Sequence, residues 1–121
     1  MIGYVTIGSN DFEKAKAFYD AVLAELGAKR GFANDHMQGY GSGRGPSLMV
    51  CTPHDKKNAS AGNGTMVALL APSREAVDKT HARALASGGS DEGAPGLRGA
   101  NFYGAYFRDL DGNKLCVFIM S

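Results

Sequence analysis

An internal duplication is the feature of this sequence that most limits what it can fold into. In the first part of each copy, apolar and glycine positions align, with Tyr4 on Met66, Ala15 on Val77, Leu23 on Leu85 and Gly27 on Gly89. After a short insertion in the second copy, the closing segments also align, with Gly45 on Gly112, Leu48 on Leu115 and Met49 on Cys116. Two long copies favour a closed pair over a solenoid, because solenoids stack many short repeats.

Each copy predicts a strand, a helix and three further strands. Residues 2–8 form a β-branched run, and apolar residues then recur at helical spacing as far as Gly27, the expected end of the helix. Asn10 and Glu13 have the spacing of a capping pair at the start of this helix. We therefore predict an α+β fold in which two βαβββ modules form curved mixed sheets around a cavity. The expected single domain spans residues 1–121, with module one at 1–52, a polar linker at 53–64 and module two at 65–121.

Composition and charge argue against several classes of protein. The 121 residues are 44% hydrophobic and 21% charged with a net charge of +1, which is ordinary for a globular chain. No basic block alternates with aromatic residues, so we expect no nucleic-acid partner. The N-terminus has neither a signal peptide nor a membrane-inserting segment, so we expect no membrane partner. Cys51 and Cys116 lie in apolar runs where buried, reduced thiols are expected, and we predict a cytoplasmic location.

Three segments resemble the glyoxalase/bleomycin-resistance/dioxygenase superfamily, also called the vicinal oxygen chelate superfamily. Its first strand and helix are similar to the opening MIGYVTIGSNDFEKAKAFYDAVLAELGAKR. The middle of its small glyoxalase-like bacterial members is similar to GNGTMVALLAPSREAVDKTHARALASGGSDEGAPGLR. Their aromatic-R-D-P-D-G-N-x-hydrophobic-E signature resembles YFRDLDGNKLCVF, with Leu110 where proline is usual. The resemblance implies the fold predicted above, a small-molecule ligand and, as in many members, a homodimer.

The positions that hold a metal in the superfamily carry other side chains here. By the resemblance, the first and last strands of each module supply His, Glu or Gln ligands, and the matching residues are Tyr4, Met66 and Cys116, with Met49 placed by its alignment on Cys116 in the internal repeat. Divalent ions in such sites need imidazole and carboxylate donors, and a Met/Met/Cys cluster suits only Cu(I). We therefore expect no metal and no other cofactor, with these residues filling the floor of an apolar cavity.

The three histidines do not replace the missing ligands. They fall in the glycine-rich part of the first copy, in the linker and on the second helix, at His36, His54 and His81. No two of them have ligand spacing on one element. We expect each to be solvated or hydrogen-bonded within the fold.

The candidate binding residues lie on the strands that hold the mapped positions. Strand alternation puts Thr6 on the side of Tyr4, and Lys114 on the side of Cys116. Aromatic and basic side chains in the strand before DLDGN offer stacking and ion pairing to a planar or anionic ligand, with cross-strand packing as the alternative. The expected ligand-binding residues are Tyr4, Thr6, Met49, Met66, Tyr103, Tyr106, Arg108, Lys114 and Cys116.

Cys116 is the one catalytic candidate, and no catalytic residue is otherwise identified. A lysine two residues away lowers the pKa of a thiol by charge attraction. No histidine base is placed near the thiol, so an inert buried cysteine is the alternative.

These observations predict a superfamily member that is metal-free and binds a small organic ligand in an apolar cavity. If the ligand mapping is wrong, the alternative is a metal-dependent lyase or isomerase like lactoylglutathione lyase, or a ring-cleaving dioxygenase, since these share Lewis-acid polarisation of the substrate. A subunit that acts only through protein contacts is a third class. The sequence leaves open whether the protein is an enzyme and which ligand it binds.

Overall fold

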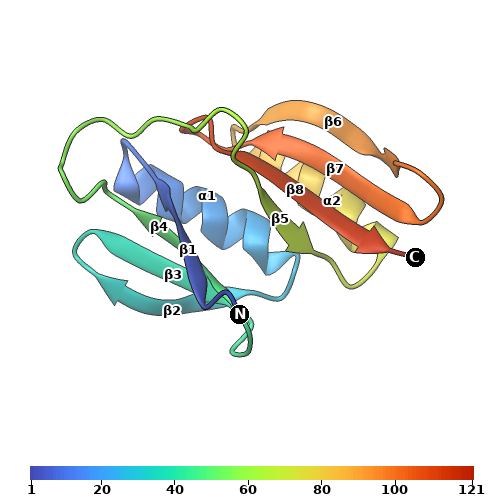
Figure 1. Ribbon diagram of the computed structural model, residues 1–121, viewed down its shortest axis with the longest axis horizontal. Coiled ribbons are helices and arrows are strands. Elements are labelled where there is room, and N and C mark those ends of the chain that lie inside the picture. Colours follow the sequence, from blue (N-terminus) through green and yellow to red (C-terminus); the bar gives the residue numbers. More distant parts are fainter.

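Two modules of the same topology make up the computed structural model, which describes residues 1–121 (Figure 1). The first module contains β1 (Tyr4–Gly8), α1 (Phe12–Ala24), β2 (Lys29–Asn34), β3 (Met37–Gly41) and β4 (Ser47–Cys51). The second contains β5 (Val67–Leu70), α2 (Arg74–Ala86), β6 (Ser90–Leu97), β7 (Phe102–Arg108) and β8 (Lys114–Met120). The predicted α+β fold with its repeated βαβββ pattern is confirmed. Neither helix has the length and hydropathy needed to cross a membrane.

The two sheets have matching strand orders, β1-β4-β3-β2 and β5-β8-β7-β6. In each sheet the first and last strands of the module pair in parallel, and the other neighbours are antiparallel. The sheets lie side by side with the helices behind them in Figure 1, so one face of each sheet is covered by helices and the other is not. We call these uncovered surfaces the open faces. The sheets curve but do not close around a cavity within one chain.

The first helix begins one residue later than the predicted capping pair requires. Its N-cap is Asp11, whose carboxylate accepts a hydrogen bond of 3.1 Å from the backbone N–H of Lys14. The predicted cap, Asn10, instead exchanges two hydrogen bonds with the backbone of Ala59 in the linker, at 2.7 and 3.1 Å. The side chain of Asn10 is therefore bound to the linker, and Asp11 caps the helix in its place. A carboxylate also suits the positive end of the helix dipole.

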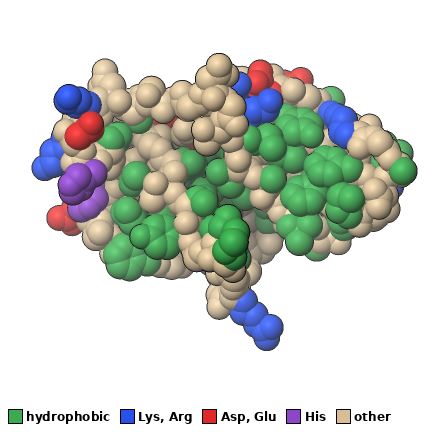
Figure 2. Space-filling model, viewed as in Figure 1, with side chains coloured by type: hydrophobic (Ala, Val, Ile, Leu, Met, Phe, Trp, Pro, Cys, Tyr) green, Lys and Arg blue, Asp and Glu red, His purple; other side chains and the backbone are tan.

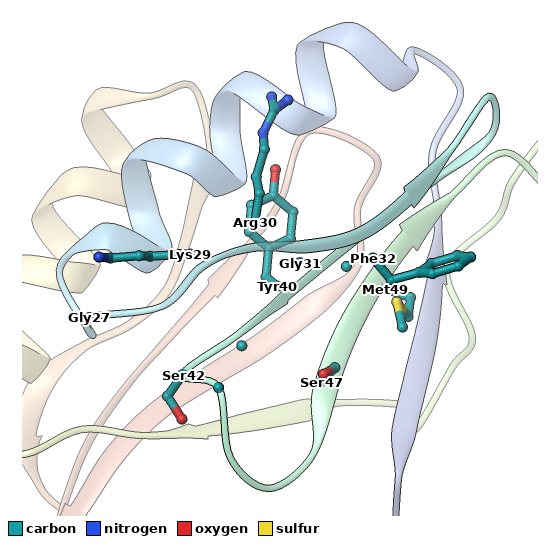
Figure 3. Close-up of a pocket in the computed structure, with 12 residues that line it drawn as sticks. Gly27, Lys29, Arg30, Gly31, Phe32, Tyr40, Ser42, Ser47 and Met49 are labelled. Carbon is teal, nitrogen blue, oxygen red and sulfur yellow. The ribbon is translucent and has the colours of Figure 1, made fainter.

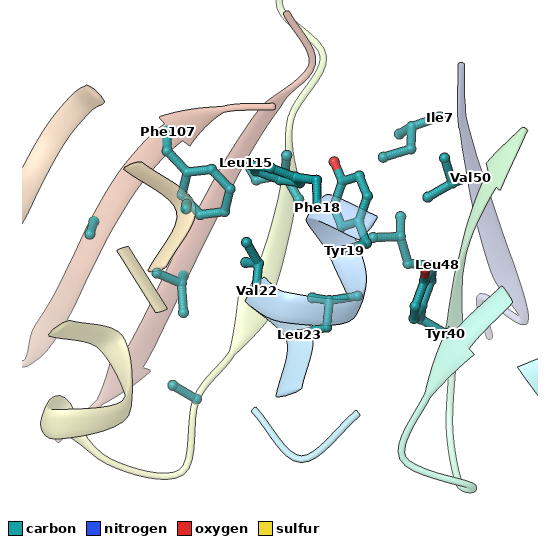
Figure 4. Packing of buried hydrophobic residues seen from close by; sticks show 14 of the residues in the cluster. Ile7, Phe18, Tyr19, Val22, Leu23, Tyr40, Leu48, Val50, Phe107 and Leu115 are labelled. Atoms are coloured by element: carbon teal, nitrogen blue, oxygen red, sulfur yellow. The ribbon is translucent and has the colours of Figure 1, made fainter. Parts of the chain in front are cut away.

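The hydrophobic core joins the two modules through α1. Phe18, Tyr19 and Val22 of this helix are at most 2% exposed. They lie between Phe107 and Leu115 of the second sheet and residues of the first sheet (Figure 4). The rings of Phe18 and Phe107 are 6.4 Å apart between centroids. Because one helix fills the space between both sheets, the modules share a single core.

A buried carboxylate holds the seam between the modules. Tyr19 of α1 donates its hydroxyl to Asp109 over 2.5 Å, and Asp109 also accepts the backbone N–H groups of Asp111 and Asn113 at 2.9 Å each. Asn113 donates to the carbonyl of Gly8 at the end of β1, at 3.0 Å. The DLDGN segment is thus a tight turn whose carboxylate and amide connect the second module to the first.

The outer edge strands are irregular. The pairing of β2 with β3 shifts in register between Arg30 and Ala33. The pairing of β6 with β7 shifts twice, on either side of Gly93, and Pro95 lies within β6. Such bulges bend a strand and interrupt its row of backbone hydrogen-bonding groups.

Candidate functional site

The open faces carry most of the residues that the sequence singles out. On the first sheet, Tyr4, Thr6 and Met49 share the open face, because Thr6 pairs with Met49 and strand residues alternate. Met49 is half-buried there. On the second sheet, Tyr106 pairs with Cys116 and Arg108 with Lys114, so all four lie on the open face. Met66, just before β5, borders the same surface beside Lys114.

Tyr103 lies on the opposite face of the second sheet. Its hydroxyl donates to Asp78 of α2 over 2.6 Å, and the guanidinium of Arg74 is 5.0 Å from its ring centroid. The structure therefore places three of the nine predicted residues on the first open face and five on the second, and it leaves Tyr103 between sheet and helix.

The first open face contains a hollow of about 480 Å³. Its floor includes Gly31, Gly39 and Gly41, and Figure 3 shows Phe32 and Met49 together at one side of it. A Cβ atom at position 39 would lie 2.7 Å from the sulfur of Met49, so the bare backbone makes room for this thioether. The hollow exists because three neighbouring positions have no side chain.

Two polar side chains at the rim of this hollow turn toward α1 instead (Figure 3). Arg30 donates two hydrogen bonds of 2.8 Å to Asp20, and the Tyr40 hydroxyl donates to the same carboxylate at 2.9 Å. Hydrogen bonding from Arg30 lowers the pKa of Asp20, and burial raises the pKa of Tyr40. These groups therefore anchor β2 and β3 to the helix and are not available to a ligand.

The second open face is filled where the first is hollow. Gly39 pairs with Met49, and Tyr106 pairs with Cys116, so Tyr106 occupies the position that Gly39 has in the first module. Cys116 is fully buried beneath this surface. Burial raises the pKa of its thiol, although Tyr106, Arg98 and Lys114 each lower it. The effect of Lys114 has the sign expected from its spacing, but burial outweighs it and the thiol stays protonated at neutral pH.

Two cations flank the Tyr106 ring. Arg98 lies 5.5 Å and Lys114 5.6 Å from the ring centroid, and neither forms an ion pair. Arg108, by contrast, binds Glu92 at 2.9 Å. The sequence did not indicate Arg98 as a site residue, because Arg98 lies just after the end of β6 and its side chain folds back over that strand. The glycines at 93 and 96, where an added Cβ would lie 3.2 Å from its guanidinium, were the available signal.

A second hollow, of about 540 Å³, lies next to Lys114. Besides Lys114, Arg108 and Met66, it is lined by residues 61–64 of the linker and by Thr65. Both hollows fall within the volume range of small-molecule sites.

The residues present do not fit a divalent metal. No three His, Cys, Asp or Glu side chains are grouped as metal ligands. Of the mapped positions, Tyr4 and Met49 lie on one open face and Met66 and Cys116 on the other. A phenol, two thioethers and a buried thiol are poor donors for the ions that bind imidazole and carboxylate. The buried histidine, His81, contacts Asp91 at 2.9 Å and closes the α2–β6 seam.

Large apolar side chains are exposed on the open faces. Leu70 is 68% exposed, Tyr4 60% and Phe32 58%. Figure 2 looks onto these faces and shows hydrophobic side chains gathered over the second sheet and along the lower part of the first. Phe102 and Phe118 add a stacked pair with centroids 5.0 Å apart. An exposed apolar surface of this kind marks a binding or association surface.

Comparisons with known proteins agree with this architecture. The model of the Glyoxalase/Bleomycin resistance protein/Dioxygenase superfamily matches residues 1–117. The chain is similar to a glyoxalase/bleomycin resistance protein from Albidiferax ferrireducens T118, with 39% identity and a TM-score of 0.93, covering 100% of this chain and 99% of that one. No curated protein sequence matches.

Two more distant solved structures share the fold. One is a lactoylglutathione lyase from Agrobacterium tumefaciens, with 20% identity and a TM-score of 0.73, covering 98% of this chain and 92% of that one. The other is TioX from Micromonospora sp. ML1, with 18% identity and a TM-score of 0.71, covering 100% of this chain and 99% of that one.

Proposed function

Because the chain belongs to the glyoxalase/bleomycin resistance protein/dioxygenase superfamily, we propose that it is a metal-free homodimer that binds a small organic ligand in an apolar cavity. The observation that carries the proposal is the pair of open faces, which expose apolar side chains and contain the hollows but are not closed by the chain itself. A second copy supplies the missing walls.

The dimer we propose places the first open face of one copy against the second open face of its partner. A twofold axis between side-by-side sheets produces this arrangement twice, giving two equivalent cavities. Shape supports the pairing, since one open face is hollow around Gly39 and the other is raised at the equivalent position by Tyr106, so that the proposed dimer sets one against the other. Each cavity then has a floor of glycine and methionine and a roof of aromatic and basic side chains.

The metal-free part of the proposal rests on donor chemistry. Lewis-acid catalysis requires ligands that hold a divalent ion and leave a coordination position for the substrate. Tyr4, Met49, Met66 and Cys116 would supply none of the imidazole or carboxylate groups that such an ion needs. Ligand binding without metal chemistry is therefore the function that this cavity supports best. The two unpaired cysteines fit a cytoplasmic location.

Elemental analysis of protein purified without chelator tests the metal-free part. Titrations with Mn²⁺, Fe²⁺, Ni²⁺, Zn²⁺ and Cu⁺ accompany it, and light scattering measures the mass in solution. We expect a mass of twice the chain and no stoichiometric binding of the divalent ions. Near-stoichiometric binding of a divalent ion would overturn the proposal and direct the work to lyase and dioxygenase assays. A monomer at all concentrations would remove the cavity.

A further inference from the structure

We propose that the ligand is an organic anion whose carboxylate or phosphate group is bound by Arg98 and Lys114 beside Tyr106. The inference rests on the proposed function, since it concerns the same cavity, and it adds the charge of the ligand and the residues that select it.

Arg98 is held in place over the open face with most of its donors free. One guanidinium nitrogen donates to the carbonyl of Ala94 at 2.6 Å. The guanidinium lies against the bare positions Gly93 and Gly96, at 3.2 Å from where each Cβ would be. The arginine therefore lies flat along β6 and reaches the ring of Tyr106. A guanidinium fixed in this way presents a planar set of donors that matches a carboxylate or phosphate.

Lys114 reaches the same ring from β8 and also borders the hollow of about 540 Å³. Its side chain is half-buried, and no carboxylate lies within ion-pair distance. The neighbouring Arg108 is already paired with Glu92, so it does not add an uncompensated charge. The second open face thus has two cations without anionic partners around one tyrosine.

Closing the dimer makes this arrangement costly without an anion. A cation–π contact with one tyrosine offsets only a small part of the hydration free energy that an ammonium or guanidinium loses on burial. The opposing first open face offers no carboxylate, because no acid lines its hollow, and Asp20 belongs to α1 on the covered side, where it binds Arg30. An anionic ligand between Arg98 and Lys114 supplies the missing charge. The apolar part of the ligand then lies against the exposed side chains around the hollow.

The test uses three probes with the same ring system: 2-naphthoate, 2-naphthyl phosphate and the neutral 2-naphthamide. Calorimetric titration of the intact protein measures each dissociation constant. We expect the anions to bind at least about tenfold more tightly than the amide. R98Q and K114Q should each weaken binding of the anions about tenfold and leave the amide unchanged. R98K should lie between R98Q and the unchanged protein, because it keeps the charge but not the planar fork.

Matched controls lie on the covered side of the molecule. R83Q and K79Q remove the same charges from α2, and binding of all three probes should be unchanged. Comparison of the two anions identifies whether the site prefers a carboxylate or a phosphate. If the amide binds as tightly as both anions, or if R98Q and K114Q weaken all three probes alike, the inference is overturned and the apolar cavity stands. If no probe binds to the dimer, the proposed function fails with it.

Discussion

Asp109 illustrates how one buried residue connects two halves of a duplicated fold. The sequence indicated a turn for DLDGN, and the carboxylate does accept two backbone N–H groups of that turn. The sequence did not indicate that Tyr19, far away in the other module, donates its hydroxyl to the same carboxylate. Burial first, and then Asp109, raise the pKa of Tyr19 well above its ordinary value, so this hydroxyl remains a donor.

D109A should therefore lower the free energy of unfolding by about 3 kcal/mol, because it leaves buried donors without an acceptor. Y19F, which removes one hydroxyl and leaves the carboxylate to its other partners, should cost about 1 kcal/mol. Urea unfolding measures both. D35A, at an exposed turn residue, is the control and should have little effect. A loss below about 1 kcal/mol for D109A would show that the seam does not depend on this group.

Cys116 gives a second prediction at the residue scale. Since burial raises the pKa of its thiol, the thiolate fraction at neutral pH is smaller than in a free cysteine. In a C51S background, alkylation by iodoacetamide at pH 7 should be slow, and its rate should rise only at a pH above the ordinary cysteine range. Y106A should uncover the thiol and accelerate alkylation about tenfold or more. Rapid alkylation of the parent protein at pH 7 would instead indicate an activated nucleophile.

At the scale of elements, periodicity located the helices, but single side chains set their ends. The helical spacing of apolar residues located α1, but the helix ends at Ala24, before the predicted Gly27. Its N-cap is Asp11 and not Asn10, because a linker residue binds the asparagine. No local pattern reveals a contact between residues so far apart. Tyr103 and Tyr106 pose the same problem in a strand. Residues three apart point to opposite sides, so only one of the two tyrosines lies on the open face.

The N-cap of α2 allows the contribution of one capping hydrogen bond to stability to be measured. The hydroxyl of Ser73 accepts the backbone N–H of Ala76 at 3.0 Å. S73A should destabilise the protein by about 1 kcal/mol in thermal or urea unfolding, because the first turn loses the partner of one N–H group. S60A, at an exposed linker serine, should change stability little. Equal effects of the two substitutions would argue against the cap as the cause.

At the scale of the whole molecule, the sequence predicted the duplication but not how the two modules pack against each other. Aligned apolar positions predicted two βαβββ modules, since strand and helix periods are local properties. Whether the sheets enclose a cavity or lie side by side depends on how α1 packs against Phe107 and Leu115 of the other module. The candidate site was predictable as a set of strand positions. Arg98 was not predicted, because it follows β6 and its side chain folds back over Gly93 and Gly96 to reach Tyr106, a contact that residue spacing does not indicate.

If two copies join through their open faces, a charge placed there should separate them. Leu70 is 68% exposed and lies on the open face of β5. L70E should shift the mass in light scattering from dimer to monomer at micromolar concentration while the circular dichroism spectrum is retained. A82E adds the same charge to the exposed side of α2 and should leave the dimer intact. A dimer that survives L70E would mean that another surface joins the copies.

The irregular edge strands β2 and β6 limit how such an assembly can grow. A chain with exposed apolar faces and free strand edges is at risk of indefinite growth into fibres. The bulge in β2 and the double shift with Pro95 in β6 break the row of donors and acceptors that an incoming strand would need. Addition of a strand at β2 or β6 is therefore disfavoured, which leaves the open faces as the larger surface for association.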